Sequence, residues 1–405
     1  MDTIPEILFL SWESPWPAYR GGTLRTLGLL RELSKYYDIE IAIISQAPLS
    51  EAQRIEVHKY ASAIVEVPMM GKRFLDKLKI FWHMFSRQIT YHCAVIELSF
   101  ANTPRVLEKI RTFPGIVYAS YGHWGTLAAG KNARNWILDQ HNADIDFWRV
   151  YASQSSKLGL KLAALVNWKL SEQHFKKIYK SVGRIVSVCE EDKQVTRIFA
   201  PDTIIDVIEN GVDCASFSPK PRRSDPEIPR VLFTGTSAPR NMTALHKFTR
   251  DAWPLIIAEM PGVELLVGGN FDLKAQAEFA HIRNIRFTGR VDDMRPAFDQ
   301  SDVFIAPFED THGSKLKIAE AMAMAMPIVS TVQGVRGFPL VDGQSVLIAH
   351  DDAQFARHVI DLLNNAPMRR NLGLAAREIA EKHLDWSMLG QRLEKIIAEV
   401  QKESA

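Results

Sequence analysis

A short predicted helix that follows a glycine-containing loop carries the side chains best suited to binding a charged ligand. Within residues 307–337 this helix holds Lys317 and Glu320. Backbone N–H groups at a helix N-terminus favour anions, and a lysine adds a point charge for phosphate. A carboxylate accepts two hydrogen bonds from a ribose diol. A second glycine loop, with Gly334 and Gly337, follows the next predicted strand. The segment therefore predicts a site for a nucleotide diphosphate.

The composition bounds what the chain can be. Its 405 residues suggest two large domains. A net charge of +2 argues against a dedicated nucleic-acid binder. The three cysteines are far apart in the sequence, so a disulfide framework or a zinc site is not expected and a reducing compartment fits. The N-terminus lacks a basic region typical of a signal peptide, and no apolar run has the length of a membrane span.

Strand and helix patterns alternate along the whole chain, which predicts an α/β protein with parallel sheets covered by helices. One set of predicted strands lies at 7–11, 39–45, 64–67, 116–119, 136–139 and 184–188, and a long helix lies within 144–181. A second set lies at 231–234, 263–267, 285–288, 302–306 and 328–331, with helices at 241–258 and 292–299. The strand at 205–208 is expected to connect the two sets, and the tail from residue 353 to residue 400 is expected to be helical.

Several further motifs occur in a fixed order and resemble those of family 4 (group 1) retaining glycosyltransferases. The donor motif is similar to a Gly-x-x-x-Lys-x-x-Glu-Ala-Met-Ala run, here residues 313–323. The other matching segments are Val-Cys-Glu-Glu-Asp at 188–192, Val-Ile-Glu-Asn-Gly-Val-Asp at 207–213, Leu-Phe-Thr-Gly at 232–235 and Phe-Thr-Gly-Arg-Val-Asp-Asp at 287–293. The resemblance is dense over residues 185–365 and sparse in the first half of the chain.

The resemblance implies a GT-B fold, in which two Rossmann-like domains face a cleft at the carboxyl ends of their strands. We expect an acceptor-binding domain at residues 1–204 and a sugar-nucleotide donor domain at 205–383. Residues 384–405 are expected to form a helix that crosses back to the first domain.

The resemblance also assigns donor-binding residues. Glu320 would bind the ribose hydroxyls, while Lys317 and Arg240 would neutralise the diphosphate, with Lys315 as a weaker candidate. The remaining donor-binding residues implied by the family are Gly22, Gly235, Gly313, Ser314, Gly334, Val335, Arg336 and Gly337, and Arg290 with Val291 are candidates for contacting the base. Each charged residue also has an ordinary interpretation as a solvated surface group.

Two positions depart from the family pattern. Where many members have a glutamate that meets the sugar, eight residues before the ribose-binding glutamate, this chain has His312, and Glu309 is three residues out of register. Thr236 and Ser237 follow Gly235, where members often have an arginine. The first departure bears on the choice of donor sugar, and the second suggests that Lys317 takes part of the phosphate-binding role.

In the first half of the chain, a loop containing Gly22 precedes a predicted helix, and His141 follows a predicted strand. By resemblance, His141 is the active-site histidine and contacts the donor sugar, so His141, Arg240 and Lys317 are the predicted catalytic residues. The alternatives are a plain turn at Gly22 and a helix cap at His141. His123, next to Trp124, is a second candidate histidine.

The resemblance implies transfer with retention of configuration, without a cofactor and without a metal, since lysine and arginine take the place of the metal. A metal site built from Asp139, His141, Asp144 and Asp146 is the alternative, but its spacing matches no familiar ligand set. The family's chemistry depends on positioned amides and cations that stabilise the leaving phosphate.

Basic and aromatic residues are concentrated at 72–91, and more lysines follow between residues 157 and 180. This pattern suggests a surface that contacts an anionic membrane and so reaches a lipid-linked acceptor. The alternative is a core-packed helix with a solvated basic face.

The sequence therefore predicts a cytoplasmic glycosyltransferase, working at the inner face of the membrane. It would move a sugar from a nucleotide-diphosphate sugar to a glycan or lipid-linked acceptor during surface polysaccharide or glycoconjugate synthesis. The alternatives are a sugar-nucleotide epimerase and a non-catalytic sugar-nucleotide-binding protein.

Overall fold

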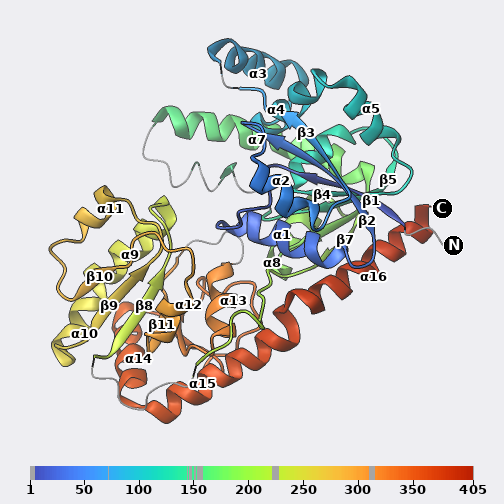
Figure 1. Cartoon of the computed structure of the whole chain (residues 1–405). Helices are drawn as coiled ribbons and strands as arrows, with labels where there is room; N and C mark the ends of the chain where they lie inside the picture. The colour runs from blue at the N-terminus through green and yellow to red at the C-terminus, as the bar shows by residue number, and fades with distance from the viewer. Residues whose placement is uncertain are drawn as a thin grey trace. The chain divides into compact units, whose positions relative to one another are not determined.

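The computed structural model describes residues 5–71, 73–143, 145, 148–149, 152, 158–220, 228–309 and 315–404. The chain divides into two compact units (Figure 1). Unit 1 contains Met1–Glu209 and Leu389–Ala405, and unit 2 contains Asn210–Met388. The sequence predicts a boundary after residue 204, whereas the structure divides after Glu209.

Unit 1 is built on a seven-stranded parallel sheet with the strand order β3-β2-β1-β4-β5-β6-β7. The strands are β1 (Glu6–Ser11), β2 (Asp38–Ser45), β3 (Ala63–Pro68), β4 (Ile116–Ser120), β5 (Ala133–Asp139), β6 (Val182–Ser187) and β7 (Ile204–Val207). The chain extends the sheet to one side of β1 and then returns to β4 on the other side. This reversal creates a switch point between β1 and β4.

Helices cover this sheet. They are α1 (Gly21–Leu33), α2 (Glu51–His58), α3 (Phe74–Arg87), α4 (Tyr91–Ala101), α5 (Pro104–Thr112), the 3-10 helix η1 (Gly122–Leu127), α7 (Leu158–Ser181) and α8 (Glu190–Phe199). Strand β1 is buried from Ile7 to Ser11 and β4 along its whole length, as expected of parallel strands covered on both faces. Strand β7, expected from the sequence as a connector, pairs with β6 and completes this sheet.

Unit 2 contains a six-stranded parallel sheet with the order β10-β9-β8-β11-β12-β13. The strands are β8 (Arg230–Thr234), β9 (Glu264–Gly268), β10 (Ile285–Phe287), β11 (Val303–Ala306), β12 (Ile328–Thr331) and β13 (Leu347–Ala349). Its switch point lies between β8 and β11, since β9 and β10 extend one way and β12 and β13 the other.

The helices of unit 2 are α9 (Pro239–Asp251), α10 (Trp253–Glu259), α11 (Leu273–Glu278), α12 (Arg295–Asp299), α13 (Leu316–Ala323), α14 (Asp352–Asn364), α15 (Ala366–Ile379) and the π-helical turn η2 (Ala380–Leu384). The predicted helix at 241–258 is divided at Ala252, the residue that ends α9 and precedes α10, where Pro254 occupies the first turn. Proline is favoured in the first turn because its missing N–H would have no helical partner there.

The last helix, α16 (Trp386–Ser404), supplies unit 1 with its final element from Leu389 onwards. Its buried residues recur at helical spacing and are Leu389, Leu393, Ile397 and Val400. Arg392 donates to the carboxylate of Glu209 at 2.7 Å and to the carbonyl of Val207 at 2.7 Å. A Cβ atom on Gly390 would lie 2.4 Å from Cβ of Glu32, so α16 packs directly on α1. The predicted return of the C-terminal helix to the first domain is confirmed.

Candidate functional site

In unit 2 the predicted donor-binding residues gather at the carboxyl ends of β8, β11 and β12, which are adjacent in the sheet. Gly235 follows β8, Pro307 follows β11, and Gly334 lies in the loop after β12. Helix α13 comes from the β11 loop. The switch point between β8 and β11 is where parallel α/β sheets bind ligands.

Lys317 on α13 reaches across the switch point to β8. Its Nζ donates to the carbonyl of Thr234, the last residue of β8, and to Oδ1 of Asn241 at 2.9 Å. The ammonium group also lies 4.7 Å from the ring centre of Phe308 and 5.1 Å from that of Phe233. Contacts with a carbonyl, an amide and two aromatic rings together hold the ammonium group of Lys317 at the carboxyl end of β8, next to the switch point.

Phe308 is a buried ring around which three cations are arranged. Besides Lys317, Nζ of Lys315 lies 5.4 Å from the ring centre and the guanidinium carbon of Arg240 lies 6.0 Å from it. Lys315 is buried and donates to the carbonyl of Gln333 at 2.9 Å, which ties the start of α13 to the loop after β12. Arg240 is exposed. The cluster concentrates positive charge that suits a diphosphate.

Glu320 is one turn along α13 from Lys317 and is partly buried. Burial raises the pKa of its carboxyl to about 7, and the charge of Lys317 only partly offsets this effect. No residue that the structure describes forms a hydrogen bond or ion pair with this carboxylate. Its oxygens therefore remain available to accept hydrogen bonds from a ligand.

The glycine loops bring backbone close to these side chains. A Cβ on Gly235 would lie 2.9 Å from the side chain of Asn241, and one on Gly334 would lie 2.3 Å from the carbonyl of Ala306. Gly337 has φ of +83°, which favours glycine. Between the two glycines, the side chain of Val335 is buried in the core, whereas Arg336 is half-buried.

Some predicted donor residues are not tested by this geometry. Gly313, Ser314 and His312 lie outside the described residues. Glu309 is exposed and forms an ion pair with Lys247 at 3.1 Å. Arg290 and Val291 are exposed in the loop after β10.

In unit 1, His141 follows β5 and lies beside the first turn of α1. Its Nε2 is 3.0 Å from Oγ of Ser120 and 3.5 Å from the carboxylate of Asp139. Tyr121 stacks on the imidazole with ring centres 3.8 Å apart. Burial lowers the pKa of His141, although Asp139 opposes the effect, so the ring is neutral near pH 7.

The other imidazole nitrogen, Nδ1, is buried and has no hydrogen-bond partner among the residues that the structure describes. A Cβ on Gly22 would lie 3.3 Å from this atom and 2.0 Å from the hydroxyl oxygen of Tyr121. The glycine therefore allows the backbone of α1 to approach both groups. The structure thus places Gly22 and His141, which the sequence analysis named separately, close to each other.

A buried ion pair holds this arrangement. Nε of Arg25 donates to both carboxylate oxygens of Asp139 at 3.1 and 3.0 Å, and Nη2 donates to Oδ1 at 2.6 Å. Nη1 of Arg25 donates to the carbonyl of Glu209 at 3.0 Å. Burial alone would raise the pKa of Asp139, but Arg25 and His141 hold it well below its usual range. The carboxylate is thus ionised and orients His141.

Two other candidates from the sequence, the histidine at position 123 and the metal site, also belong to unit 1. Trp124 is buried in the core, and His123 packs against the rings of His92 and Phe175 at 4.8 and 5.4 Å. Burial holds the pKa of His123 well below its usual value. For the alternative metal site, Asp144 and Asp146 lie outside the described residues; within the described ranges no three His, Cys, Asp or Glu side chains gather as metal ligands do.

Sequence reasoning missed four side chains that complete the two clusters, namely Ser120, Tyr121, Asn241 and Phe308. Ser120 ends the strand β4 next to the switch point and Tyr121 follows it, and that position is the signal that could have identified them. Tyr121 also has φ of +94°, which is unusual for a residue other than glycine and marks local strain. No sequence signal pairs Asn241 with Lys317, since 76 residues separate them.

Two parallel sheets of the Rossmann type, each with polar clusters at its switch point, and a C-terminal helix that packs on the first unit define the GT-B class of protein. Residues 228–365 match the family model described as glycosyl transferases group 1. This match lies entirely within unit 2.

Three known proteins are similar to this chain over longer stretches of its sequence or fold. An uncharacterized 44.6 kDa protein of the cps region of Klebsiella pneumoniae is 21% identical over 94% of this chain and 96% of its own. A GDP-mannose-dependent monoacylated alpha-(1-6)-phosphatidylinositol monomannoside mannosyltransferase of Corynebacterium glutamicum is 22% identical over 57% of this chain and 67% of its own. The crystal structure of HepE of Anabaena with UDP-glucose superposes with a TM-score of 0.65 at 13% identity, covering 98% of this chain and 100% of that one.

Proposed function

We propose that this protein is a retaining glycosyltransferase that moves a sugar from a nucleotide-diphosphate sugar to a glycan or lipid-linked acceptor. The observation that carries the proposal is the pair of Lys317 and Glu320 at the switch point of unit 2. There a fixed cation lies one helical turn from a carboxylate that has no partner among the described residues.

In this proposal Glu320 accepts hydrogen bonds from the two ribose hydroxyls, and Lys317 and Arg240 neutralise the diphosphate. The amides of Gly235 and of residues 334–337 approach the phosphates, and Gly313 and Ser314 face the donor sugar. The three cations around Phe308 support this assignment, because a diphosphate needs about two charges neutralised.

The reaction breaks the bond between the anomeric carbon and the diphosphate. Positive charge then develops on the sugar and negative charge on the leaving phosphate, which Lys317 and the loop amides stabilise. We assign to His141 the contact with the transferred sugar, with Nδ1 as the free position. Retention follows if the acceptor attacks on the face that the phosphate leaves, and the departing phosphate takes the acceptor's proton. No residue of this scheme requires a metal or a cofactor.

The relatives support an acceptor in surface polysaccharide or glycoconjugate synthesis. One is a protein of a cps region and another a mannosyltransferase that acts on a phosphatidylinositol monomannoside. HepE was crystallised with UDP-glucose, which makes a UDP-sugar a reasonable first donor to test here. We place the reaction in the cytoplasm, at the inner face of the membrane.

The test is a binding screen of the purified protein against UDP-, GDP-, ADP- and CMP-sugars. One donor should bind, and Glu320→Ala should weaken it by about 10- to 100-fold, as expected for lost hydrogen bonds to a charged group. Glu278→Ala, an exposed glutamate of the same unit, is the matched control and should bind normally. A folded protein that binds none of these donors would refute the proposal.

Catalysis is tested with the donor so identified. Slow hydrolysis of the donor that Glu320→Ala abolishes would separate an enzyme from a binding protein. Interconversion of the donor into its epimer, without loss of nucleotide, would instead show an epimerase. The anomeric configuration of the first transferred sugar, read by NMR, decides between retention and inversion.

A further inference from the structure

Helix α3 turns its apolar side away from the protein. Only Ile80 and Met84, four residues apart, are buried, and they pack into the core of unit 1. Trp82 is 71% exposed and Phe74 is 74% exposed. The exposed apolar residues of the helix are Phe74, Leu75, Leu78, Phe81, Trp82 and Phe85.

These six residues form one continuous stripe. At about 100° per residue they fall within an arc of roughly 120° that lies opposite Ile80 and Met84. Lys77 flanks the stripe on one side and Lys79 on the other. The helix is therefore amphipathic, but its larger apolar face points to solvent, whereas that of a core-packed helix points to the core. The alternative of a core-packed helix with a solvated basic face accounts for Ile80, Met84 and the exposed lysines, but not for the six exposed apolar side chains.

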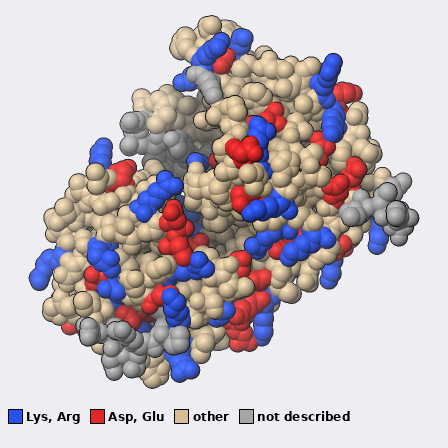
Figure 2. Space-filling model, in the orientation of Figure 1, with Lys and Arg blue, Asp and Glu red and all other residues tan. Residues whose placement is uncertain are grey.

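The acidic groups nearby point elsewhere. Asp76 lies on the protein side of the stripe and accepts a hydrogen bond from the backbone of Arg73 at 3.1 Å, which caps α3. Glu97 of α4 interacts with His83 at 2.8 Å and with Arg87 at 3.6 Å. By contrast, Lys77 and Lys79 form no ion pair with any residue that the structure describes. At the α3 end of unit 1, Figure 2 shows blue Lys and Arg atoms with a smaller red patch among them.

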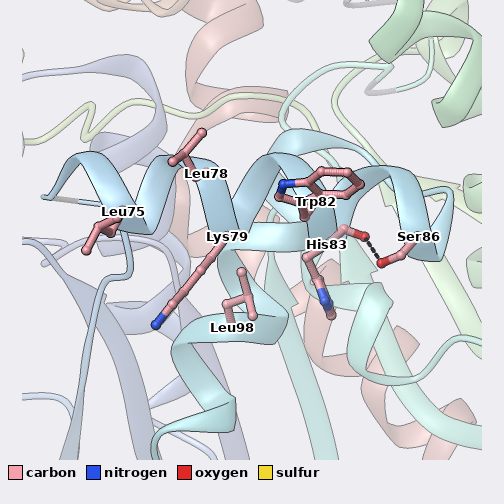
Figure 3. A pocket seen from close by; sticks show the side chains of 7 residues that line it. All are labelled: Leu75, Leu78, Lys79, Trp82, His83, Ser86 and Leu98. Carbon is pink, nitrogen blue, oxygen red and sulfur yellow. Dashed lines mark hydrogen bonds between the residues drawn. The ribbon is translucent and has the colours of Figure 1, made fainter.

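A groove opens along the same helix. It has a volume of ≈ 530 Å³ and is lined by Leu75, Leu78, Lys79, Trp82, His83 and Ser86 of α3 and by Leu98 of α4. Figure 3 shows Leu78 and Trp82 along one side of α3, with the chain of Lys79 extending from the helix. An apolar groove edged by a lysine suits an acyl chain whose headgroup is anionic.

A second helix repeats the pattern. The first half of α7 exposes Leu158, Leu162, Leu165 and Val166 on one face of the helix and Leu160 on the opposite face, and it carries Lys161 and Lys169. Oδ1 of Asn167 on α7 accepts a hydrogen bond from the amide of Tyr91, shortly after the end of α3, at 3.0 Å. Together α3 and α7 supply eleven of the twenty-five large hydrophobic side chains that are exposed in the described structure. Such concentration in two helices that both contact α4 marks an interaction surface.

We propose that the stripe of α3, with the first half of α7, is the surface by which this protein lies on an anionic lipid bilayer. An apolar arc flanked by lysines is the composition that seats a helix in the plane of a membrane interface, with its rings among the acyl chains and its lysines at the headgroups. Among the described residues no helix has the length and hydrophobicity of a membrane span. The proposed contact is peripheral, and it is independent of which sugar is transferred.

The test is flotation of the full chain with vesicles of phosphatidylcholine alone and with vesicles that also contain phosphatidylglycerol. Binding should require phosphatidylglycerol and weaken as salt is raised. The double variant Phe81→Ser, Trp82→Ser should bind at least about tenfold more weakly, because it removes two exposed rings from the interface. Leu273→Ser, which changes an 83% exposed leucine of unit 2, is the control and should bind like the unchanged protein.

Further variants test separately the role of the lysine charges and the depth to which Trp82 enters the bilayer. Lys77→Glu with Lys79→Glu should abolish the preference for phosphatidylglycerol, while Lys274→Glu in unit 2 should not. Trp82→Phe should keep the binding but reduce the quenching of tryptophan fluorescence by brominated lipid. The proposal is overturned if Phe81→Ser, Trp82→Ser binds as well as the unchanged protein, or if the unchanged protein binds neither kind of vesicle. A dimer that Phe81→Ser, Trp82→Ser dissociates would also overturn it, since the stripe would then cover a second copy. None of these readouts depends on glycosyl transfer.

Discussion

Glu320 faces two opposing demands. As a ribose ligand it must be ionised, yet burial raises its pKa to about 7, so the folded protein near neutral pH holds it close to half protonated. An unfolded chain would ionise the same carboxyl from its ordinary value of 4.5 upwards. Keeping Glu320 ionised for its proposed ligand role therefore lowers the stability of the folded protein.

The sign of this cost can be tested with Glu320→Gln. A group whose folded pKa is raised keeps its stabilising contribution below pH 4.5 and loses it as the pH rises through about 7. The variant should therefore equal the unchanged protein near pH 4.5 and exceed it above pH 7, by roughly 3 kcal/mol. Denaturation by urea at both pH values, without donor, measures the difference.

Because every other titratable group is common to both proteins, the pH dependence of the difference in their free energies of unfolding reports the ionisation of Glu320 alone. A stability difference that did not change with pH would refute the raised pKa. Saturating donor should shrink or reverse the advantage of the variant above pH 7, since only the glutamate gains the ribose hydrogen bonds.

At the residue scale the sequence predicted what is local. Lys317 and Glu320 are three residues apart on one helix, so their proximity follows from helical periodicity. The pairing of Arg25 with Asp139 joins residues 114 positions apart and depends on which strands are neighbours at the switch point. Nothing in the sequence alone fixes that order.

At the scale of elements, the loop after β12 depends on the close approach of Gly334 to the end of β11. We expect Gly334→Ala to weaken donor binding at least about tenfold and to destabilise unit 2 by about 1–3 kcal/mol, because its Cβ would lie 2.1 Å from Oγ of Ser330 and 2.3 Å from the carbonyl of Ala306. Titration calorimetry with the donor and thermal unfolding measure the two effects.

Gly262→Ala is the matched control, since nothing lies within 4 Å of the Cβ position there. It should leave donor binding unchanged and be neutral or slightly stabilising, because alanine restricts the unfolded chain. Normal donor affinity in Gly334→Ala would show that the loop does not contact the phosphates.

The elements themselves were predictable because buried parallel strands are apolar runs bounded by turn residues. Each observed strand except β13 falls on a predicted one, and β13 spans only Leu347–Ala349. What periodicity could not give is the direction of an apolar face. For α3 the same spacing fits a helix packed inwards or turned outwards, and only the tertiary contacts of Ile80 and Met84 decide between them.

At the scale of the whole molecule, the return of the chain to unit 1 through α16 is expected to contribute strongly to the stability of that unit. Leu393 is fully buried on α16. We expect Leu393→Ala to lower the free energy of unfolding of unit 1 by about 2–5 kcal/mol, as for other buried leucines. Donor affinity, which we assign to unit 2, should be unchanged at temperatures below the unfolding transition.

The control lies on the same helix. Met388 is 40% exposed, so Met388→Ala should cost less than about 1 kcal/mol. Both variants are compared by urea denaturation, with donor binding as the reporter of unit 2. If Leu393→Ala cost no more than Met388→Ala, the packing of α16 on unit 1 would be unimportant for stability.

The interrupted path of the chain also has a consequence for the order of events on the ribosome. Unit 2 is continuous from Asn210 to Met388, so it can fold as soon as it has emerged. Unit 1 is started first but lacks Leu389, Leu393, Ile397 and Val400 until unit 2 has been made. The surface of unit 1 that α16 covers therefore stays exposed to water while unit 2 is synthesised, and the packing of unit 1 is completed only afterwards. The domain begun first is the one completed last.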